Sequence, residues 1–130
     1  MEFKVRDIAE VRFDREKNIV YINFLKEYLA DKEIKEVIDT IHNTINPKFA
    51  VISDFSKVIF LTQEARKTLS QYRYEDIIAA SGVFKNNLQA KIANLFLTFN
   101  KPKYPIKFFF SKNEAEKWIL NILSAHKINN

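Results

Sequence analysis

Apolar residues follow two rhythms along the chain, and the rhythm changes several times. They alternate loosely between Phe3 and Phe13, and again from Ile19 to Phe24, as in strands that bury one face. The polar residues 14–18 between these stretches form a predicted turn, in which Asn18 tolerates a left-handed backbone. The chain is therefore predicted to begin with an antiparallel hairpin.

Helical spacing of apolar residues then recurs four times. The first predicted helix begins at the N-cap Asp31 and ends at Asn46 and Pro47, because proline cannot continue a helix. The others begin at Thr62, at Asn86 or Asn87, and at a capping box formed by Ser111 and Glu114. The side chains expected to face inward are Ile34, Val37, Ile38, Ile41 and Ile45, then Ala65, Leu69 and Tyr72, then Leu88, Ile92, Leu95, Phe96 and Phe99, and finally Ala115, Trp118, Ile119, Ile122 and Leu123.

Short apolar runs at residues 49–54, 77–84 and 106–110 separate these helices. Continuous runs of this kind are typical of strands that are buried on both faces. The predicted order is ββαβαβαβα, which places the chain in the α/β class with a mixed five-stranded sheet covered by four helices. A length of 130 residues suits one domain, predicted to span residues 1–130.

The composition argues against several catalytic chemistries. The chain has no cysteine, which excludes disulfides, thiolate metal sites and cysteine nucleophiles. The chain has one glycine, Gly82, whereas a glycine-rich phosphate-binding loop needs several, so such a loop is excluded. The two histidines, His42 and His126, share no ligand spacing with each other, so a structural role is predicted for both. We therefore expect no enzymatic activity, no metal and no cofactor.

The net charge of +5 is unevenly distributed. Residues 85–112 contain six lysines and no acidic residue, which suggests an acidic partner, an anionic membrane or nucleic acid, unless these lysines merely face solvent. Residues 99–104 interleave aromatic and basic side chains, but nucleic-acid binding remains the weaker hypothesis because the basic residues there are lysines without an arginine fork. With no transmembrane segment or apolar leader in the sequence, we expect a cytoplasmic protein.

Three stretches carry a resemblance to a known family. They are residues 49–62, residues 93–110, and the ending that runs from Phe110 through Glu114 and Ala115 to Trp118. Their order and spacing resemble the STAS domains of the anti-sigma-factor antagonists, and in particular the SpoIIAA-like branch that is also described as STAS/SEC14-like. The resemblance implies a domain that regulates by binding a partner protein.

One position departs from the pattern of the family. In regulatory STAS proteins a serine at the start of the second helix is phosphorylated by a partner kinase, and here Gln63 stands at that position. Glutamine cannot accept phosphate, so the usual switch is in doubt. Thr62 and Ser56 are the nearby hydroxyls, and each is either a phosphate acceptor or an ordinary cap and loop residue.

The candidate site lies where the parallel strands end, because ligands of open α/β sheets bind beyond the carboxyl ends of the strands. A non-enzymatic regulatory or protein-interaction module is the leading hypothesis, and its predicted binding residues are Asp54, Ser56, Lys57, Thr62, Gln63, Arg66, Phe84 and Lys85. Two helix starts flanked by Lys57 and Lys85 could also form an anion site, with ordinary caps as the alternative.

The alternative function is a carrier of a lipid-like ligand, whose pocket Phe84, Leu95, Phe96 and Phe99 would line. The sequence leaves a homodimer open as well.

Overall fold

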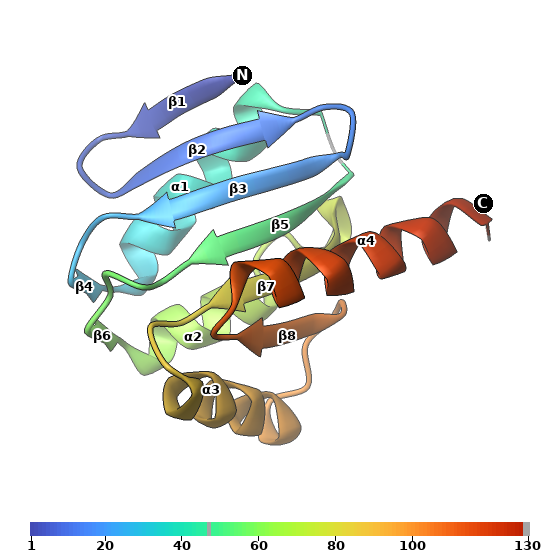
Figure 1. The fold of residues 1–130 in the computed structure, drawn as a ribbon. Coiled ribbons are helices and arrows are strands. Elements are labelled where there is room, and N and C mark those ends of the chain that lie inside the picture. Colours follow the sequence, from blue (N-terminus) through green and yellow to red (C-terminus); the bar gives the residue numbers. More distant parts are fainter. Residues whose placement is uncertain (47, 129–130) are drawn as a thin grey trace.

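The computed structural model of the chain describes residues 1–46 and 48–128. Its main sheet has six strands in the order β1-β2-β3-β5-β7-β8 (Figure 1). The first three strands pair antiparallel, whereas β3, β5, β7 and β8 are parallel to one another. The strands are β1 (Glu2–Val5), β2 (Ala9–Asp14), β3 (Ile19–Phe24), β5 (Phe49–Asp54), β7 (Ile77–Val83) and β8 (Ile106–Phe109).

A second, two-stranded sheet lies beyond the carboxyl ends of the parallel strands (Figure 1). It pairs β4 (Tyr28–Leu29) in parallel with β6 (Phe60–Leu61), and we call it the β4–β6 ribbon. It ties the segment after β3 to the segment after β5, so two connections that are separate in sequence become one local structure.

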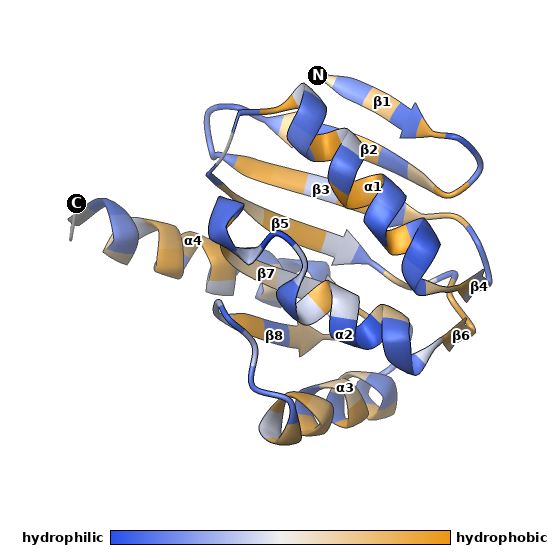
Figure 2. Cartoon of the chain, turned by 180° about the vertical axis from the view of Figure 1, so that it is seen from behind, coloured by the Kyte–Doolittle hydropathy of each residue, from blue (hydrophilic) through white to orange (hydrophobic). Residues whose placement is uncertain are grey.

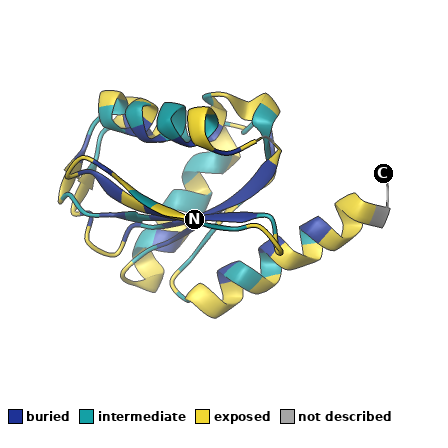
Figure 3. Cartoon of the chain, turned by 90° about the horizontal axis from the view of Figure 1, so that it is seen from above, coloured by how far each residue is buried: buried dark blue, intermediate teal, exposed yellow. Residues whose placement is uncertain are grey.

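The helices occupy three different positions around the main sheet. Helices α1 (Asp31–Thr44) and α2 (Gln63–Gln71) cover one face, and α4 (Lys112–Ile128) lies on the other face (Figure 3). Helix α3 (Asn87–Phe99) lies alongside the edge strand β8 (Figure 1). A short 3₁₀ helix (Tyr74–Asp76) precedes β7. The mixed α/β architecture and the four predicted helices are therefore confirmed for the described residues.

The central strands bury both faces, as their continuous apolar runs predict. Along β5, Phe49 and Val51 pack into the cluster beneath α1 and α2, whereas Ala50 and Ile52 pack into the cluster beneath α4. Side chains alternate across a strand, so one run of apolar residues supplies two cores. The inward stripes predicted for the first and last helices are confirmed by the burial of Ile34, Val37, Ile41 and Ile45, and of Ala115, Ile119 and Leu123.

The sheet has six strands because the predicted first strand, Phe3 to Phe13, is two strands. The chain turns at Arg6, whose φ of 46° lies in the left-handed region, and the Ile8 amide donates to the Val5 carbonyl. The alternation of apolar residues in fact breaks here, since Ile8 is fully buried and out of phase with Phe3 and Val5.

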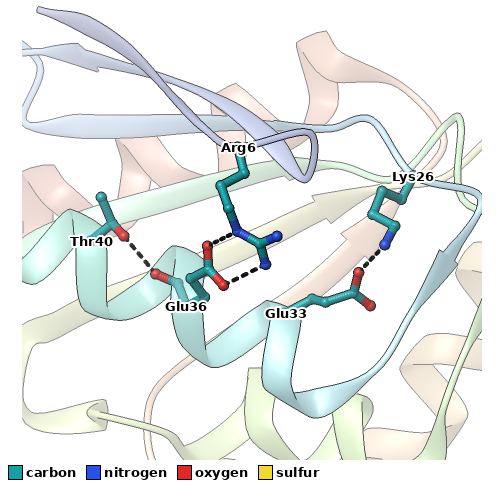
Figure 4. A network of polar contacts seen from close by, with 5 residues as sticks. All are labelled: Arg6, Lys26, Glu33, Glu36 and Thr40. Atoms are coloured by element: carbon teal, nitrogen blue, oxygen red, sulfur yellow. Dashed lines mark hydrogen bonds and ion pairs between the residues drawn. The ribbon is translucent and has the colours of Figure 1, made fainter.

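Contacts with α1 hold this turn and the segment after β3 in place. The Arg6 guanidinium binds the Glu36 carboxylate through two hydrogen bonds of 2.7 Å each, and Lys26 forms an ion pair with Glu33 (Figure 4). Both acidic residues lie on α1, and the Thr40 hydroxyl donates to the Glu36 carbonyl. The helix is thereby attached to two different connections of the sheet.

Two predicted helix ends need correction. The N-cap of α1 is Ala30 rather than Asp31, and the Glu33 carboxylate accepts the hydrogen bond from the Ala30 amide at 3.0 Å. Glu33 thus supplies one half of a capping box, and the other half is absent because alanine has no side-chain acceptor. The helix ends at Thr44, before the predicted stop, and Pro47 lies outside the described residues.

Helix α3 contradicts the predicted direction of its apolar stripe. Leu88, Ile92, Leu95 and Phe99 are exposed, and Phe96 is half-buried. The buried side of α3 is instead centred on Ala90. Apolar periodicity identified the helix correctly, but this helix has apolar residues on more than one side, and the pattern could not tell which side meets the sheet.

Candidate functional site

Asp54 ends β5 and connects two parts of the carboxyl edge. Its Oδ1 accepts a hydrogen bond of 2.8 Å from the Ser56 amide, and its Oδ2 lies 3.2 Å from Nζ of Lys112 on α4. Burial by itself would raise the pKa of Asp54, but the hydrogen bonds from Ser56 and Lys112 outweigh it and hold the pKa below its ordinary value. The Asp54 carboxylate is therefore charged at neutral pH and engaged with its own loop and with α4.

Asp54 also lines a wide groove on the α4 side of the sheet, with a volume of about 800 Å³. This sheet groove exists because α4 packs beneath β5, β7 and β8, reaches only part of β3, and leaves the lower faces of β1 and β2 uncovered (Figure 3). Its lining includes Arg12, Tyr21, Asp54, Lys112, Asn113 and Glu116.

A polar network forms one wall of the sheet groove. The Tyr21 hydroxyl donates to the Glu116 carboxylate, which also pairs with Lys17 at 3.1 Å, and the Arg12 guanidinium lies 4.0 Å from the centre of the Tyr21 ring. Burial and the bond to Glu116 raise the pKa of Tyr21 to about 12. Glu116 is thus shared by Tyr21 and Lys17, and the groove lining contains both cations and anions, which gives the groove no preference for ligands of one charge.

Thr62 acts as the N-cap of α2, as its position predicts. Its hydroxyl accepts a hydrogen bond of 3.0 Å from the Ala65 amide. Arg66, one turn further, donates to the Leu61 carbonyl at 3.2 Å, and its guanidinium lies 5.5 Å from the centre of the Phe96 ring on α3. Gln63 is exposed. Arg66 therefore connects α2 to α3, and the orientation of its guanidinium follows from these two contacts.

Phe84 belongs to a row of aromatic rings that crosses the carboxyl ends of the strands. Phe24 stacks on Phe55 at 5.1 Å, Phe55 stacks on Phe84 at 5.2 Å, and Phe84 contacts Phe108 at 5.4 Å. Gly82 makes room for this row, because a Cβ there would lie 2.5 Å from Phe108 and 2.9 Å from Phe55. The single glycine of the chain is thus required by packing, and the row of rings packs beneath the edge.

The pocket predicted for an apolar ligand is small. Phe84 and Phe96 line a cavity of about 30 Å³ between α2, α3 and the sheet. Leu95 and Phe99, the other two predicted lining residues, do not reach it because they face away from the sheet. A cavity of this size is close to the volume of one water molecule, so it has no room for a lipid chain.

The predicted site residues fall on two sides of the main sheet. Asp54 lies in the sheet groove on the α4 side, whereas Arg66 and Phe84 line the small cavity on the α1 and α2 side. Lys57 and Lys85 are exposed. Within the described part of the chain, neither lysine forms a side-chain hydrogen bond or an ion pair with another residue. The cap residues Thr62 and Asn86 each occupy an amide of their helix start, with bonds of 3.0 and 2.9 Å, so the geometry favours ordinary caps over the anion site.

The β4–β6 ribbon presents a surface that the sequence pattern did not reveal. Tyr28, Ile59 and Phe60 are each more than half exposed, and the two aromatic rings lie 6.5 Å apart. The amides of Ile59 and Phe60 both donate to the Glu27 carbonyl, at 2.7 and 3.0 Å, which fixes the backbone beneath these side chains. We call Tyr28, Ile59 and Phe60 the ribbon patch. Its strands have two residues each, too short for periodicity to indicate them.

Comparison with known proteins places the chain in a family. Residues 13–123 match the family model described as a domain of unknown function, DUF7793. The chain belongs to the DUF7793 family. The matched residues of this DUF7793 domain run from the end of β2 into α4 and include every predicted site residue. Among curated proteins, none matches the sequence.

The DUF7793 domain also resembles a solved structure of low sequence identity. That structure is an uncharacterized protein of the DUF3478 family with a SpoIIAA-like fold, from Shewanella loihica PV-4. The two share 12% identity with a TM-score of 0.57, and the likeness covers 85% of this chain and 91% of the other. The SpoIIAA-like fold implied by the sequence resemblance is therefore confirmed for the DUF7793 domain.

Two features are absent from the described residues. No group of three or more His, Asp or Glu side chains in residues 1–46 and 48–128 is placed to hold a metal ion. In the same residues, no helix combines the length and the apolar character needed to cross a bilayer.

Proposed function

We propose that this domain is a non-catalytic interaction module that binds a partner protein through the ribbon patch at its carboxyl edge. The observation that carries the proposal is the exposure of Tyr28, Ile59 and Phe60 on a backbone that is held in place on both sides. Exposed aromatic side chains on a rigid base are characteristic of the residues that contribute most to binding in protein interfaces.

The surroundings of the ribbon patch support the same function. Thr62 and Gln63 follow β6 directly, so the start of α2 lies next to the patch. The resemblance to anti-sigma-factor antagonists implies a regulatory contact at this helix start, which supports the proposal. Lys57 and Ser56 lie in the exposed loop that leads into the ribbon. The proposed interface therefore has an apolar centre and a polar rim, which is the usual arrangement in protein complexes.

Regulation by phosphorylation is the less supported part of the hypothesis. Thr62 Oγ already accepts a hydrogen bond within the helix cap, and Gln63 cannot accept phosphate. We expect the module to bind without a phosphate switch at these two positions.

The carrier function has less support than the interaction module, since the cavity between α2 and α3 has a volume of about 30 Å³. Native mass spectrometry that found a co-purified lipid would instead favour the carrier function.

A site-specific cross-linking experiment tests the interaction module. A photoreactive amino acid in place of Phe60 should capture one defined protein in the native host, and that protein, once purified, should bind the wild-type domain in calorimetry. Tyr28→Ser and Phe60→Ser should each weaken this binding by about tenfold or more. Tyr74→Ser is the matched control, because Tyr74 is an exposed aromatic residue at the opposite end of β7. Equal affinities of the wild type and both ribbon variants would refute the proposal.

A further inference from the structure

Helix α3 carries an apolar stripe that points away from the rest of the domain. Leu88, Ile92, Leu95 and Phe99 are 66%, 59%, 58% and 79% exposed. They follow one another at intervals of four, three and four residues, which places them on one side of the helix. Exposed apolar patches of this continuity mark interaction sites in soluble proteins. We call these four residues the α3 stripe.

The attachment of α3 to the sheet explains why the stripe faces outward. The Asn94 side chain donates to the Phe108 carbonyl at 2.9 Å and accepts from the Phe108 amide at 2.8 Å. Asn94 therefore pairs with the free edge of β8 as a neighbouring strand would, and α3 lies beside the sheet instead of over a face (Figure 2). A helix in this position can bury only its near side, which is centred on Ala90.

The charges around the stripe are of one sign. Lys85 precedes α3, Lys91 borders the stripe between Leu88 and Leu95, and Lys101 and Lys103 follow the helix. None of these four lysines forms an ion pair with any residue of the described chain, unlike Lys112, which is bound to Asp54. The chain has no acidic residue from 85 to 112, so the α3 stripe has unpaired lysines near both ends and along one side.

These charges decide between possible occupants of the stripe. A second copy of the chain, packed stripe against stripe, would bring two acid-free lysine clusters together, and their repulsion opposes such a dimer. A bilayer that contains anionic lipids satisfies both features at once. Its flat surface reaches both ends of a helix that lies in its plane, its acyl boundary accepts the apolar side chains, and its phosphates attract the lysines.

We propose that α3 is an interfacial helix by which the domain binds the surface of anionic membranes. Leu88, Ile92, Leu95 and Phe99 enter the headgroup and acyl boundary, and Lys85, Lys91, Lys101 and Lys103 contact lipid phosphates. The ribbon patch takes no part in this contact, so membrane binding and partner binding are separate functions of two surfaces. The docked position of α3 is the binding conformation, and no opening of the core is required.

Vesicle flotation tests the membrane proposal. The full chain should bind vesicles of phosphatidylcholine with about one-third phosphatidylglycerol about tenfold more strongly than pure phosphatidylcholine vesicles. High salt should weaken the binding, because salt screens the lysines. The double variant Ile92→Ser with Leu95→Ser should lose binding by about tenfold. Lys101→Glu with Lys103→Glu should lose the preference for the anionic lipid. Circular dichroism should confirm that each variant is folded.

Control variants separate this proposal from the proposed function. Ile59→Ser with Phe60→Ser also removes two exposed apolar side chains, but from the ribbon patch, and should leave vesicle binding unchanged. Loss of vesicle binding in this control, equal binding to both vesicle types, or unchanged binding of the Ile92/Leu95 variant would each overturn the role of α3. A dimer in solution that the Ile92/Leu95 variant dissociates, with no vesicle binding by the wild type, would overturn it in favour of a second copy.

The lack of cysteine allows a direct second measurement. Ile92→Cys creates a single thiol, to which an environment-sensitive fluorophore can be attached. Its emission should increase and shift to shorter wavelength with anionic vesicles, while the same label at Tyr74→Cys should not respond. An unresponsive label at position 92 would show that the stripe stays in water and would overturn the proposal.

Discussion

Asn94 and Phe108 form a pair of hydrogen bonds in which a side-chain amide takes the place of a β-strand. Nδ2 of Asn94 donates to the Phe108 carbonyl at 2.9 Å, and its Oδ1 accepts from the Phe108 amide at 2.8 Å. The pair satisfies backbone groups on the outer edge of β8, which would otherwise remain available to another strand. A single residue of α3 thus protects the end of the sheet and sets the position of the helix.

Replacement of Asn94 should therefore loosen α3. We expect Asn94→Ala to lower the free energy of unfolding by about 1–3 kcal/mol, since two backbone groups of Phe108 lose their partner. Hydrogen exchange should become faster at the Phe108 amide and along α3. Thr98→Ala is the control, because Thr98 is exposed on the same helix and its hydroxyl makes a bond within the helix, to the Asn94 carbonyl at 3.5 Å, and none to β8. Equal exchange rates in the Asn94 variant and the wild type would show that packing alone holds the helix.

Gly82 should tolerate no larger side chain. A Cβ at this position would lie 2.5 Å from Cδ1 of Phe108 and 2.9 Å from Cε2 of Phe55. We expect Gly82→Ala to reduce the unfolding free energy, measured in urea, by about 1–3 kcal/mol through overpacking. Phe108→Leu in the Gly82→Ala background should recover part of the loss, because it removes the closest ring atoms. Purely additive effects in this double-mutant cycle would contradict the direct clash.

Thr62 should contribute to stability as a helix cap. The Thr62 hydroxyl accepts a hydrogen bond of 3.0 Å from the Ala65 amide. Thr62→Ala should therefore lower the free energy of unfolding by about 1 kcal/mol, whereas Thr62→Ser should keep most of the stability of the wild type. Gln63→Ala, at the neighbouring exposed position, should have little effect. Thermal unfolding of the three variants measures the difference. A Thr62→Ala variant as stable as the wild type would mean that the cap bond has no net value.

His42 should make stability fall in mildly acidic solution. It is buried, with Nδ1 3.1 Å from a carboxylate oxygen of Asp76 and Nε2 without a hydrogen-bond partner. Burial lowers the pKa of His42 below its ordinary value of 6.5, although Asp76 and Asp39 oppose the shift; Arg73 adds to it. At neutral pH the ring is therefore neutral and lies beside the Asp76 carboxylate without a full ion pair.

The direction of the pH effect follows from this shift. As the pH falls below 6.5 the unfolded chain takes up a proton before the folded chain does, so the folded state loses stability until the lower folded pKa is passed. We expect urea midpoints to decrease over this interval in the wild type. His42→Gln, which cannot titrate, should lack this decrease. The same decrease in the His42→Gln variant would assign it to other groups.

Some sequence patterns predicted the structure of their segment correctly. The stripe from Ile34 to Ile45 and the apolar run of β5 each predicted both the element and its buried side, because these elements have one clear apolar side or are apolar throughout. The cap role of Thr62 and the left-handed backbone of Asn18 were also readable, since each depends on neighbours within a few residues. The turn at Arg6 was missed, although the displaced phase of Ile8 indicated it.

The functional surfaces were harder to predict because they depend on distant contacts. The ribbon patch requires Tyr28 and Phe60 to meet through two strands of two residues each. The sheet groove requires Tyr21 and Glu116 to meet across the sheet, and no local pattern connects them. Asp54 and Arg66, predicted at one edge, lie on opposite sides of the sheet, because alternation along β5 turned the Asp54 side chain toward α4.

The sequence alone determined the class of the fold, the order of its four helices and of strands β3, β5, β7 and β8 among them, and the SpoIIAA-like resemblance. It could do so because side-chain periodicity and local capping act over only a few residues. Tertiary structure decided the order of strands in the sheet, the doubling of the first strand and the outward direction of the α3 stripe. The reason is physical: a helix with apolar residues on several sides buries whichever side its attachment selects, and for α3 that attachment is the bond between Asn94 and Phe108.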